Sequence, residues 1–435
     1  MGVGQRVLLA PVGTSGDVHP LVSLAPNLVR RGHEVILVTA EPFRALAERL
    51  GLGFRAIGTE HDFRAALEDP HIWNPRLAVY ALARYLSRFM GESYQVLEEL
   101  YEPGRTVCAA TSLAFSARIA QERLGMPLAT VHLQATVFPS SSDPPNLAMP
   151  FEDRMPRRIR QGALRIGEAM ADRSFGPPIN QLRAELGLAP VSRIWRDYWH
   201  SPQCVLCMFP DWFAEPQPDW PQQVTLCGFP LYDEADVTPL PAEVEGFLDQ
   251  GPAPVVITPG TGNTQAAHFL QEALNGCRAL GLRSILLTRH PQQLPPNLDG
   301  DTLAADYAPF GSLLPRAAAV IHHGGIGTLA QGLAAGIPQL IMPMAFDQPD
   351  NAKRLRRLGV GRGLAPFRFR ARAVAQELGE LISSQEVART AQLLSSRMDP
   401  EAARERACRE ILGLMGTDGA VAPRWFGRAS RGSTR

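Results

Sequence analysis

Lysine is almost missing from this sequence, because Lys353 is the sole lysine and arginine carries nearly all of the positive charge. Net charge is missing as well, since 43 Lys and Arg residues are balanced by 43 Asp and Glu residues. Balanced charge and 45% hydrophobic residues do not suit a protein that coats nucleic acid, nor a disordered polyelectrolyte. We therefore expect a globular protein without a nucleic-acid partner.

Long hydrophobic runs are also missing. No apolar stretch approaches the roughly 20 residues that a membrane-spanning helix needs. No signal peptide is recognised at the start of the chain. These observations predict a cytoplasmic protein that at most associates peripherally with the inner face of the cell membrane.

The cysteines form no regular framework, which excludes a small disulfide-stapled scaffold. We expect all six to be buried free thiols in a reducing compartment: Cys108, Cys204, Cys207, Cys227, Cys277 and Cys408. Cys204 and Cys207 have the spacing of a zinc-binding pair. They lack a second pair and lie in a strand pattern, so a buried strand is the favoured interpretation.

The beginning of the chain is predicted to form a strand, a loop, a helix and a second strand. Arg6–Ala10 and Glu34–Thr39 are short apolar runs, and the segment between them has a helical period that ends at Gly32. We expect Pro20 at the first helical position, and Pro26 to kink the helix because it lacks a backbone donor. The pattern predicts a βαβ unit.

Similar units continue along the 435 residues, a length that corresponds to roughly two or three domains. Prolines and acidic residues without hydrophobic period cluster at 229–241, where we place a linker. We expect two α/β domains at residues 1–228 and 242–415, with the helix near Glu401 to Leu414 crossing back to the first domain. Residues 416–435 have the composition of a disordered tail.

The most informative segment is Ala318–Thr328, where an apolar strand runs into a glycine turn and then a helix. Such a turn offers free backbone N–H groups and the positive end of a helix dipole, which together bind phosphate. The hydroxyl of Thr328 and the ring of His323 can each donate a hydrogen bond to a phosphate oxygen.

Taken alone, Gly325–Ala330 also fits the dinucleotide fingerprint, with Asp347 about 20 residues later. However, this fingerprint usually opens a cofactor domain, whereas here it lies deep in the second half of the chain. Residues 347–352 supply carboxylates and amides that suit several sugar hydroxyls better than one ribose. An NAD-dependent oxidoreductase is therefore a minor alternative.

Together these residues resemble the nucleotide-sugar signature of glycosyltransferase family 1, whose members have two facing Rossmann-like domains and an interdomain cleft, the GT-B fold. The matching positions are His323, Gly325, Thr328, Gly336, Ile337, Pro338, Pro343, Asp347, Gln348, Asn351 and Ala352. Gly13–Pro20 is similar to the loop of bacterial and sterol-type members. His200–Gln203, Asp219–Pro221 and Gly228–Pro230 are similar to the catalytic chain of rhamnolipid-forming rhamnosyltransferases.

The resemblance implies that the C-terminal domain binds a nucleotide diphosphate sugar. Tyr307 or its neighbours would stack on the base, while Asp347 and Gln348 would hold the sugar hydroxyls. The other implied donor-binding residues are Gly16, Gly260, Thr261, Gly262, His323, Gly325, Gly327 and Thr328. Many members use a glutamate for the ribose hydroxyls where this chain has Gln331, which makes a 2′-deoxyribose, as in a dTDP-sugar, easier to accept.

The same resemblance places the catalytic base in the N-terminal loop. A carboxylate such as Asp17 can take the proton of the acceptor hydroxyl while that hydroxyl attacks the anomeric carbon. His19 is the substitute base if Asp17 only orients the site. A simpler alternative is that Asp17 caps a helix that starts near Pro20.

We expect an inverting, metal-independent hexosyltransferase with no cofactor besides its nucleotide-sugar co-substrate, because the helix dipole, the backbone amides and His323 can offset the charge of the leaving group. The specific hypothesis is rhamnose from dTDP-rhamnose onto a lipophilic acceptor such as a hydroxyalkanoyloxyalkanoate. Alternatives are a UDP-glucose-dependent enzyme acting on a sterol or macrolide, and a non-catalytic nucleotide-sugar-binding protein.

Two further features have open interpretations. The tryptophans Trp195, Trp199, Trp212 and Trp220 could stack on an acceptor or fill an interdomain core. His132 ends an apolar strand at the edge where ligands gather in parallel sheets, and could face the cleft.

Overall fold

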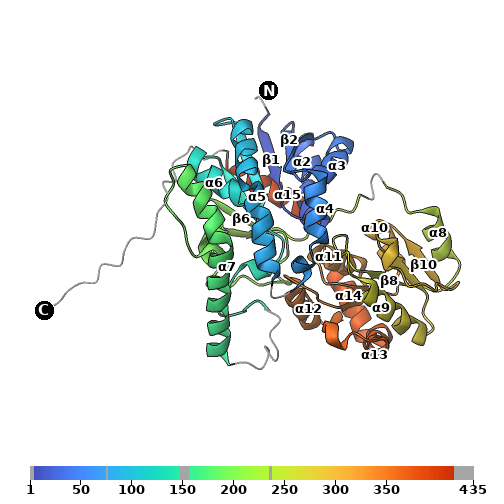
Figure 1. The fold of residues 1–435 in the computed structure, drawn as a ribbon. Coiled ribbons are helices and arrows are strands. Elements are labelled where there is room, and N and C mark those ends of the chain that lie inside the picture. Colours follow the sequence, from blue (N-terminus) through green and yellow to red (C-terminus); the bar gives the residue numbers. More distant parts are fainter. Residues whose placement is uncertain (1–3, 75–76, 147–155, 235–237, 416–435) are drawn as a thin grey trace.

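The computed structural model describes residues 4–74, 77–146, 156–234 and 238–415. In this part of the chain the strands form two parallel sheets with helices packed around them (Figure 1). The N-terminal sheet has the order β3-β2-β1-β4-β5-β6-β7. Its strands are β1 (Arg6–Ala10), β2 (Glu34–Thr39), β3 (Gly53–Ala56), β4 (Thr106–Thr111), β5 (Leu128–His132), β6 (Cys204–Cys207) and β7 (Val224–Leu226).

Apolar side chains on both faces of these strands explain the continuous hydrophobic runs. Val7 and Leu9 belong to one core cluster and Leu8 to the other, and all three are fully buried. The helices of this half are α1 (Ser15–Val22), α2 (Ala25–Arg30), α3 (Arg44–Arg49), α4 (Glu60–Glu68), α5 (Ala78–Leu100), α6 (Phe115–Leu124) and α7 (Arg157–Glu185). All six cysteines are buried and free, as predicted, and Cys204 and Cys207 lie in β6.

The first helix differs from the prediction. It begins at Ser15 rather than near Pro20, and Pro20 lies inside it. A second helix, α2, begins at Ala25 with Pro26 in its first turn. Because proline has no N–H to donate, the helix breaks between α1 and α2 instead of kinking, and Pro26 occupies a position where no donor is needed.

The C-terminal sheet has the order β10-β9-β8-β11-β12-β13. Its strands are β8 (Val255–Thr258), β9 (Ser284–Leu287), β10 (Thr302–Ala305), β11 (Ala319–His322), β12 (Gln339–Ile341) and β13 (Gly361–Gly363). Its helices are α8 (Ala242–Asp249), α9 (Ala267–Ala279), α10 (Phe310–Leu313), α11 (Ile326–Ala335), α12 (Gln348–Arg357), α13 (Ala371–Ser383) and α14 (Gln385–Ser396). The described strands therefore fall on either side of the predicted linker at 229–241.

Each sheet reverses its strand order at one point. In the N-terminal sheet β1 lies between β2 and β4, and in the C-terminal sheet β8 lies between β9 and β11. Loops that leave the carboxyl ends of strands at such a point diverge and open a crevice for ligands. The loops after β1, β4, β8 and β11 are therefore the positions where a site is expected.

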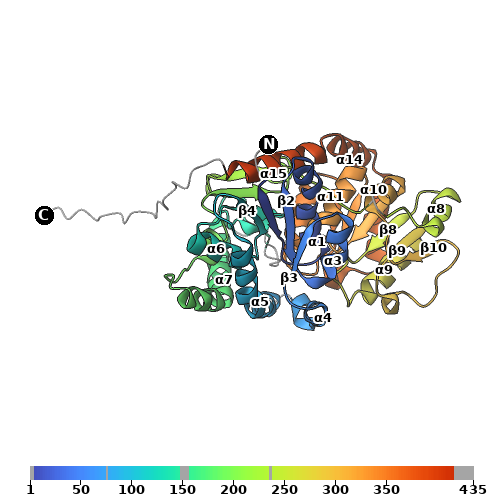
Figure 2. The ribbon, with the colours of Figure 1, turned by 90° about the horizontal axis from the view of Figure 1, so that it is seen from above.

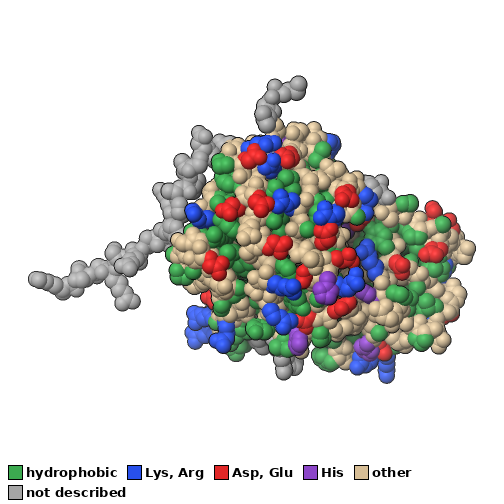
Figure 3. Space-filling model, turned by 45° about the horizontal axis from the view of Figure 1, so that its top comes forward, with side chains coloured by type: hydrophobic (Ala, Val, Ile, Leu, Met, Phe, Trp, Pro, Cys, Tyr) green, Lys and Arg blue, Asp and Glu red, His purple; other side chains and the backbone are tan. Residues whose placement is uncertain are grey.

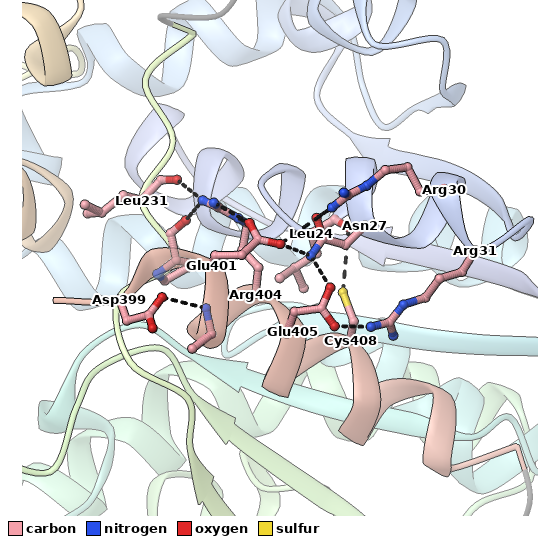
Figure 4. A network of polar contacts seen from close by, with 12 residues as sticks. Leu24, Asn27, Arg30, Arg31, Leu231, Asp399, Glu401, Arg404, Glu405 and Cys408 are labelled. Carbon is pink, nitrogen blue, oxygen red and sulfur yellow. Dashed lines mark hydrogen bonds and ion pairs between the residues drawn. The ribbon is translucent and has the colours of Figure 1, made fainter.

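The last helix, α15 (Pro400–Gly413), returns to the N-terminal half and packs against α2, β4, β5 and β6 (Figures 1 and 2). Figure 4 shows the polar contacts that attach it. Asn27 in α2 donates to Glu401 and Glu405 at 3.0 and 2.7 Å. Arg404 donates to the carbonyls of Pro230 and Leu231 at 2.9 and 3.2 Å, so α15 also holds the start of the linker.

Some predicted features cannot be compared with the structure. The tail predicted at 416–435 lies outside the described residues. The domain boundaries at 228 and 242 stay predictions.

Candidate functional site

The two sheet crevices open into one cavity of about 1720 Å³ between the halves of the molecule. The loops after β1, β4, β8 and β11 all contribute to its wall, together with the linker residues Phe229 to Asp233. Every residue that the sequence analysis assigned to the site lines this cavity: Gly16, Asp17, His19, Gly260, Thr261, Gly262, Tyr307, His323, Gly325, Gly327, Thr328, Asp347 and Gln348. Gln331 lines it as well.

Acidic and basic side chains are interspersed over the face drawn in Figure 3. Within the described ranges, no group of three or more His, Cys, Asp or Glu side chains could hold a metal ion. No helix in the same ranges is long and apolar enough to cross a membrane.

The two adjacent histidines after β11 have different surroundings. His322 is fully buried, accepts a hydrogen bond from Gly324 N–H at 3.1 Å and bonds to Gln339 Oε1 at 3.0 Å, so both of its ring nitrogens are occupied. The Nδ1 atom of His323 is buried and has no partner among the described residues. Burial lowers the pKa of His323 to about 4, which keeps its ring neutral at pH 7.

Two glycines give the His323 ring its space. A Cβ on Gly260 would stand 2.4 Å from His323 Cε1, and a Cβ on Gly325 would stand 2.5 Å from Nε2. Gly260 also has a φ of +86°, which side chains rarely adopt. The ring is therefore enclosed by the loop after β8 and the N-cap of α11, and a ligand at this helix N-terminus would meet backbone N–H groups and the imidazole together.

The next loop brings Asp347 and Gln348 to the same wall. Gln348 Oε1 accepts hydrogen bonds from the backbone N–H groups of Met344 and Ala345 at 2.7 and 3.0 Å, so this oxygen holds the loop and is not free for a ligand. Asn351 donates to Asp347 Oδ2 at 2.6 Å and to the carbonyl of Gly324 at 2.9 Å, which ties this loop to the glycine turn.

Asp347 and Asp17 come from opposite halves of the molecule. Burial raises the pKa of Asp347 to about 7, and the nearby charge of Asp17 adds to this effect. Burial also raises the pKa of Asp17, to about 6. These two carboxyl groups thus lie on opposite sides of the cavity, and burial moves the pKa of each close to neutral pH.

Asp17 does cap a helix, which was the alternative interpretation of this residue. The helix is α1, which begins at Ser15 rather than near Pro20. Asp17 Oδ2 accepts from the N–H of Thr14, the N-cap of α1, at 2.9 Å. Gly13 leaves room for the carboxylate, because a Cβ at that position would stand 2.1 Å from Asp17 Oδ2. One carboxylate oxygen is therefore committed to the loop, and the group still lies on the cavity wall.

His19 is directed toward the linker. Its Nε2 lies 3.5 Å from Glu234 Oε1, and its ring packs edge-on against Tyr232 with centroids 5.4 Å apart. Glu234 also pairs with Arg49, and the hydrogen bond to His19 lowers the pKa of Glu234. Nothing in the sequence alone indicated this contact between α1 and the linker.

The linker also contacts Tyr307. The Tyr307 hydroxyl donates to the carbonyl of Asp233, and the guanidinium of Arg289 lies 5.5 Å from the centroid of the Tyr307 ring. Arg289 follows β9 and lines the cavity, but the sequence analysis did not select it. Its position just beyond the carboxyl end of β9 was the available signal.

The N-terminal half of the cavity is mostly apolar. Its lining includes Leu82, Leu86, Phe89 and Met90 of α5 and Ile166 and Met170 of α7. The tryptophans divide: Trp195 and Trp199 line the cavity, whereas Trp212 and Trp220 pack against the core around β6. The Nε1 atoms of Trp195 and Trp199 are buried and have no partner among the described residues.

His132 does not face the cleft, because its side chain is fully buried behind the sheet edge. Ser112, which follows β4, occupies the wall in its place. The sequence analysis missed Ser112, although it directly follows the carboxyl end of β4.

Comparison with known proteins identifies both halves of the chain. Residues 7–138 match the N-terminal domain of glycosyltransferase family 28, and residues 285–414 match the C-terminal domain of proteins like erythromycin biosynthesis protein CIII. The O-mycaminosyltylonolide 6-deoxyallosyltransferase of Streptomyces fradiae is 31% identical over 425 residues, which cover 93% of this chain and 96% of that protein. None of these three matches has a name that refers to rhamnolipids or sterols. The resemblance to rhamnolipid-forming and sterol-type enzymes therefore stays a prediction.

Two solved structures share the fold. The glycosyltransferase of kitacinnamycin superposes with a TM-score of 0.71 at 20% identity, covering 94% of this chain and 99% of that one. The spinosyn rhamnosyltransferase SpnG, solved with thymidine diphosphate, superposes with a TM-score of 0.65 at 20% identity, covering 93% and 100%. The predicted arrangement of two α/β halves with parallel sheets is thereby confirmed.

Proposed function

This chain belongs to the EryCIII-like, family-28 glycosyltransferases of the GT-B fold, and from that premise we propose that it transfers a 6-deoxyhexosyl group, with inversion, from a dTDP-sugar to a hydroxyl of a lipophilic acceptor. It is a glycosyltransferase by family. Rhamnose is the specific sugar we propose. The observation that carries the proposal is the unpartnered Nδ1 of His323 in a cavity that also contains Asp17.

The donor would bind the C-terminal half. Backbone N–H groups at the start of α11 and the His323 ring would contact the diphosphate, and the loop Gly260–Gly262 lies against the same ring. A neutral imidazole can donate one hydrogen bond to the leaving diphosphate without a metal ion. Tyr307 and Arg289 line the end where we place the base.

Two observations support a thymidine nucleotide. Gln331 stands where many family members have a glutamate for the ribose hydroxyls, and an amide does not require a 2′-hydroxyl as strongly as a carboxylate does. The relative from Streptomyces fradiae is named for a 6-deoxyhexosyl transfer, and SpnG was solved with thymidine diphosphate.

Asp17 would act as the general base. With a pKa of about 6 it is mostly ionised at pH 7, yet basic enough to receive a proton in the transition state. Its Oδ2 is held by Thr14 N–H, so the carboxylate is oriented before the acceptor arrives. The acceptor hydroxyl would lose its proton to Asp17 while its oxygen attacks the anomeric carbon, and the diphosphate would leave on the opposite side.

The apolar wall from α5 and α7 supports a large lipophilic acceptor. The name of the Streptomyces fradiae relative contains tylonolide, a macrolactone, so we place a macrolactone alcohol first and a hydroxyalkanoyloxyalkanoate second.

The test is product mass from the purified chain, given dTDP- and UDP-sugars with each acceptor. We expect transfer from dTDP-rhamnose or another dTDP-6-deoxyhexose. Transfer from UDP-glucose alone would replace the proposed donor. If dTDP and UDP bind but no acceptor is glycosylated, and Asp17→Asn changes nothing, the chain would be a non-catalytic binding protein.

A further inference from the structure

A chain of three hydrogen-bonded side chains runs from the cavity wall into the core of the N-terminal half. Ser112 Oγ lies 2.7 Å from His132 Nδ1, and His132 Nε2 lies 2.9 Å from His200 Nδ1. The two histidines are 0% and 5% exposed, whereas Ser112 lines the cavity. The function proposed above assigns no role to these residues.

Aromatic neighbours hold the two rings in place. Phe138 packs edge-on against His132, with centroids 5.3 Å apart, and stacks on His200 at 5.2 Å. Trp220 also stacks on Phe138, with ring centroids 4.2 Å apart. Neither imidazole can rotate without displacing this cluster. The protonation of the two rings therefore determines which atom donates and which accepts in each hydrogen bond.

Both rings are neutral. Burial lowers the pKa of His132 well below its usual value and that of His200 to about 3, and the positive charge of Arg118 opposes protonation of His200 further. A neutral imidazole has one nitrogen that donates and one that accepts. The direction of one hydrogen bond in this series of side chains therefore determines the direction of all the others.

The backbone of Trp195 acts on His200 and raises its pKa, as an accepting carbonyl does. We therefore assign the single N–H of His200 to Nε2, facing that carbonyl, which leaves Nδ1 as an acceptor. His132 Nε2–H then donates to His200 Nδ1, so His132 Nδ1 must accept the hydroxyl proton of Ser112. Ser112 consequently presents only lone pairs to the cavity.

We propose that Ser112 determines acceptor specificity: its oxygen accepts a hydrogen bond from a second hydroxyl or N–H group of the acceptor, next to the hydroxyl that receives the sugar. This inference rests on the proposed function. The reacting hydroxyl gives its one proton to Asp17 and has none left for Ser112, so the partner of Ser112 must be another donor.

The loops that carry the two residues are in contact. Val12 N–H donates to Thr111 Oγ1 at 2.9 Å, which joins the segment that leads to Asp17 to the end of β4. We therefore expect a diol acceptor to place one hydroxyl at Asp17 and the other at Ser112, and we choose a 1,3-diol as the test compound. A ketone in place of the second hydroxyl would set its lone pairs against those of Ser112, and a site built for a hydrogen-bond donor rejects such an analogue.

The first test concerns the direction of the chain and needs no acceptor. We would record ¹⁵N spectra of the histidine side chains in the full-length protein and assign His132 and His200 from His132→Gln and His200→Gln. We expect His132 protonated on Nε2 and bare on Nδ1. The opposite tautomer would make Ser112 a donor toward the cavity and would overturn the proposal.

The second test compares a macrolactone 1,3-diol with the same macrolactone oxidised to the β-hydroxyketone. We expect the wild-type kcat/KM ratio to favour the diol by at least about tenfold, mainly through KM. Ser112→Ala should bring the ratio close to one, Ser112→Thr should restore it, and His132→Gln should behave like Ser112→Ala. Ser93→Ala is the matched control, because Ser93 also lines the cavity and its hydroxyl bonds to Ser116, at 2.7 Å, rather than to a histidine.

The two possible failures are distinguishable. Transfer with the same ratio in wild type and Ser112→Ala would overturn the role of Ser112 and leave the glycosyltransferase reaction intact. If wild-type protein neither binds dTDP or UDP nor transfers sugar to either macrolactone, the proposed function falls and the acceptor role of Ser112 falls with it. Far-UV circular dichroism and dTDP affinity, both expected to be unchanged in Ser112→Ala, verify that the variant is folded.

Discussion

The imidazole of His323 lies against the backbone of Gly260, so closely that a Cβ on Gly260 would stand 2.4 Å from the ring. Two loops from different strands thereby enclose one unpartnered ring nitrogen. We expect Gly260→Ala to displace His323 and to weaken dTDP binding at least about tenfold, since backbone strain at a positive φ adds to the clash. Isothermal titration measures the affinity. Gly246→Ala in α8, where a Cβ meets nothing within 4 Å, should leave it unchanged.

A substitution at Gly327 tests where the diphosphate binds. A Cβ at this position meets nothing within 4 Å, and Gly327 lies in the first turn of α11. Gly327→Ala should therefore leave the free energy of unfolding unchanged or raise it by up to about 1 kcal/mol. Its methyl group would occupy the space that we assign to phosphate, so dTDP affinity should fall. A variant that binds dTDP as tightly as wild type would show that the nucleotide lies elsewhere.

Asp17→Asn separates catalysis from binding. We expect the turnover rate to fall roughly 10² to 10⁴-fold, which is the usual contribution of a general base, with dTDP affinity unchanged. The amide oxygen can still accept from Thr14 N–H, so the loop should keep its conformation. Equal turnover would exclude Asp17 as the base, and a joint loss of dTDP binding would indicate a structural role instead.

The same substitution should stabilise the fold at neutral pH. Burial raises the pKa of Asp17 from 3.8 to about 6, so ionisation opposes folding, and this cost develops between about pH 4 and pH 6. Asp17→Asn should raise the free energy of unfolding by up to about 3 kcal/mol above pH 7 and by little at pH 3.5. Urea unfolding at both pH values measures this.

Substitution of Asp62 should change the free energy of unfolding in the opposite direction, in the same urea-unfolding experiment. Asp62 makes the equivalent capping contacts with Thr59, but these hydrogen bonds lower its pKa. Its charge therefore favours folding, and Asp62→Asn should destabilise the protein at pH 7. The same sign of change in both variants would contradict this electrostatic explanation.

The pH profile reports the ionisation of Asp17 directly. The base must be ionised, so kcat/KM should fall about tenfold for each pH unit below pH 6 and level off above it. Assays between pH 5 and pH 8, with stability verified at each pH, provide the curve. An acid limb near pH 4 would mean that Asp17 is not desolvated in the working enzyme.

Arg404 should hold the C-terminal helix in place. It donates to the carbonyls of Pro230 and Leu231 from the middle of α15 (Figure 4). Loss of these charged hydrogen bonds in Arg404→Ala should lower the free energy of unfolding by about 1 to 3 kcal/mol. Arg409→Ala, at an exposed position of the same helix, should change it by less than about 0.5 kcal/mol. Equal effects of the two would argue against a specific role for Arg404.

Strands were predicted well where burial on both faces makes an uninterrupted apolar run. Val7, Leu8 and Leu9 in β1 are an example, and the glycine turn after β11 was recognisable from local residues alone. The sequence analysis missed β3, β7 and β13, because these short strands at or near sheet edges are half-exposed and take their pairing from the neighbouring strand.

The sequence by itself determined the two α/β halves and the loops that carry Asp17 and His323, because hydrophobic period and glycine turns are local properties of the chain. Only the tertiary structure decided that His19 pairs with Glu234, that Gln348 closes its own loop and that Ser112 rather than His132 reaches the cavity. These outcomes depend on contacts between segments far apart in the chain, and the burial that sets the pKa of Asp17 arises only when both halves close around it.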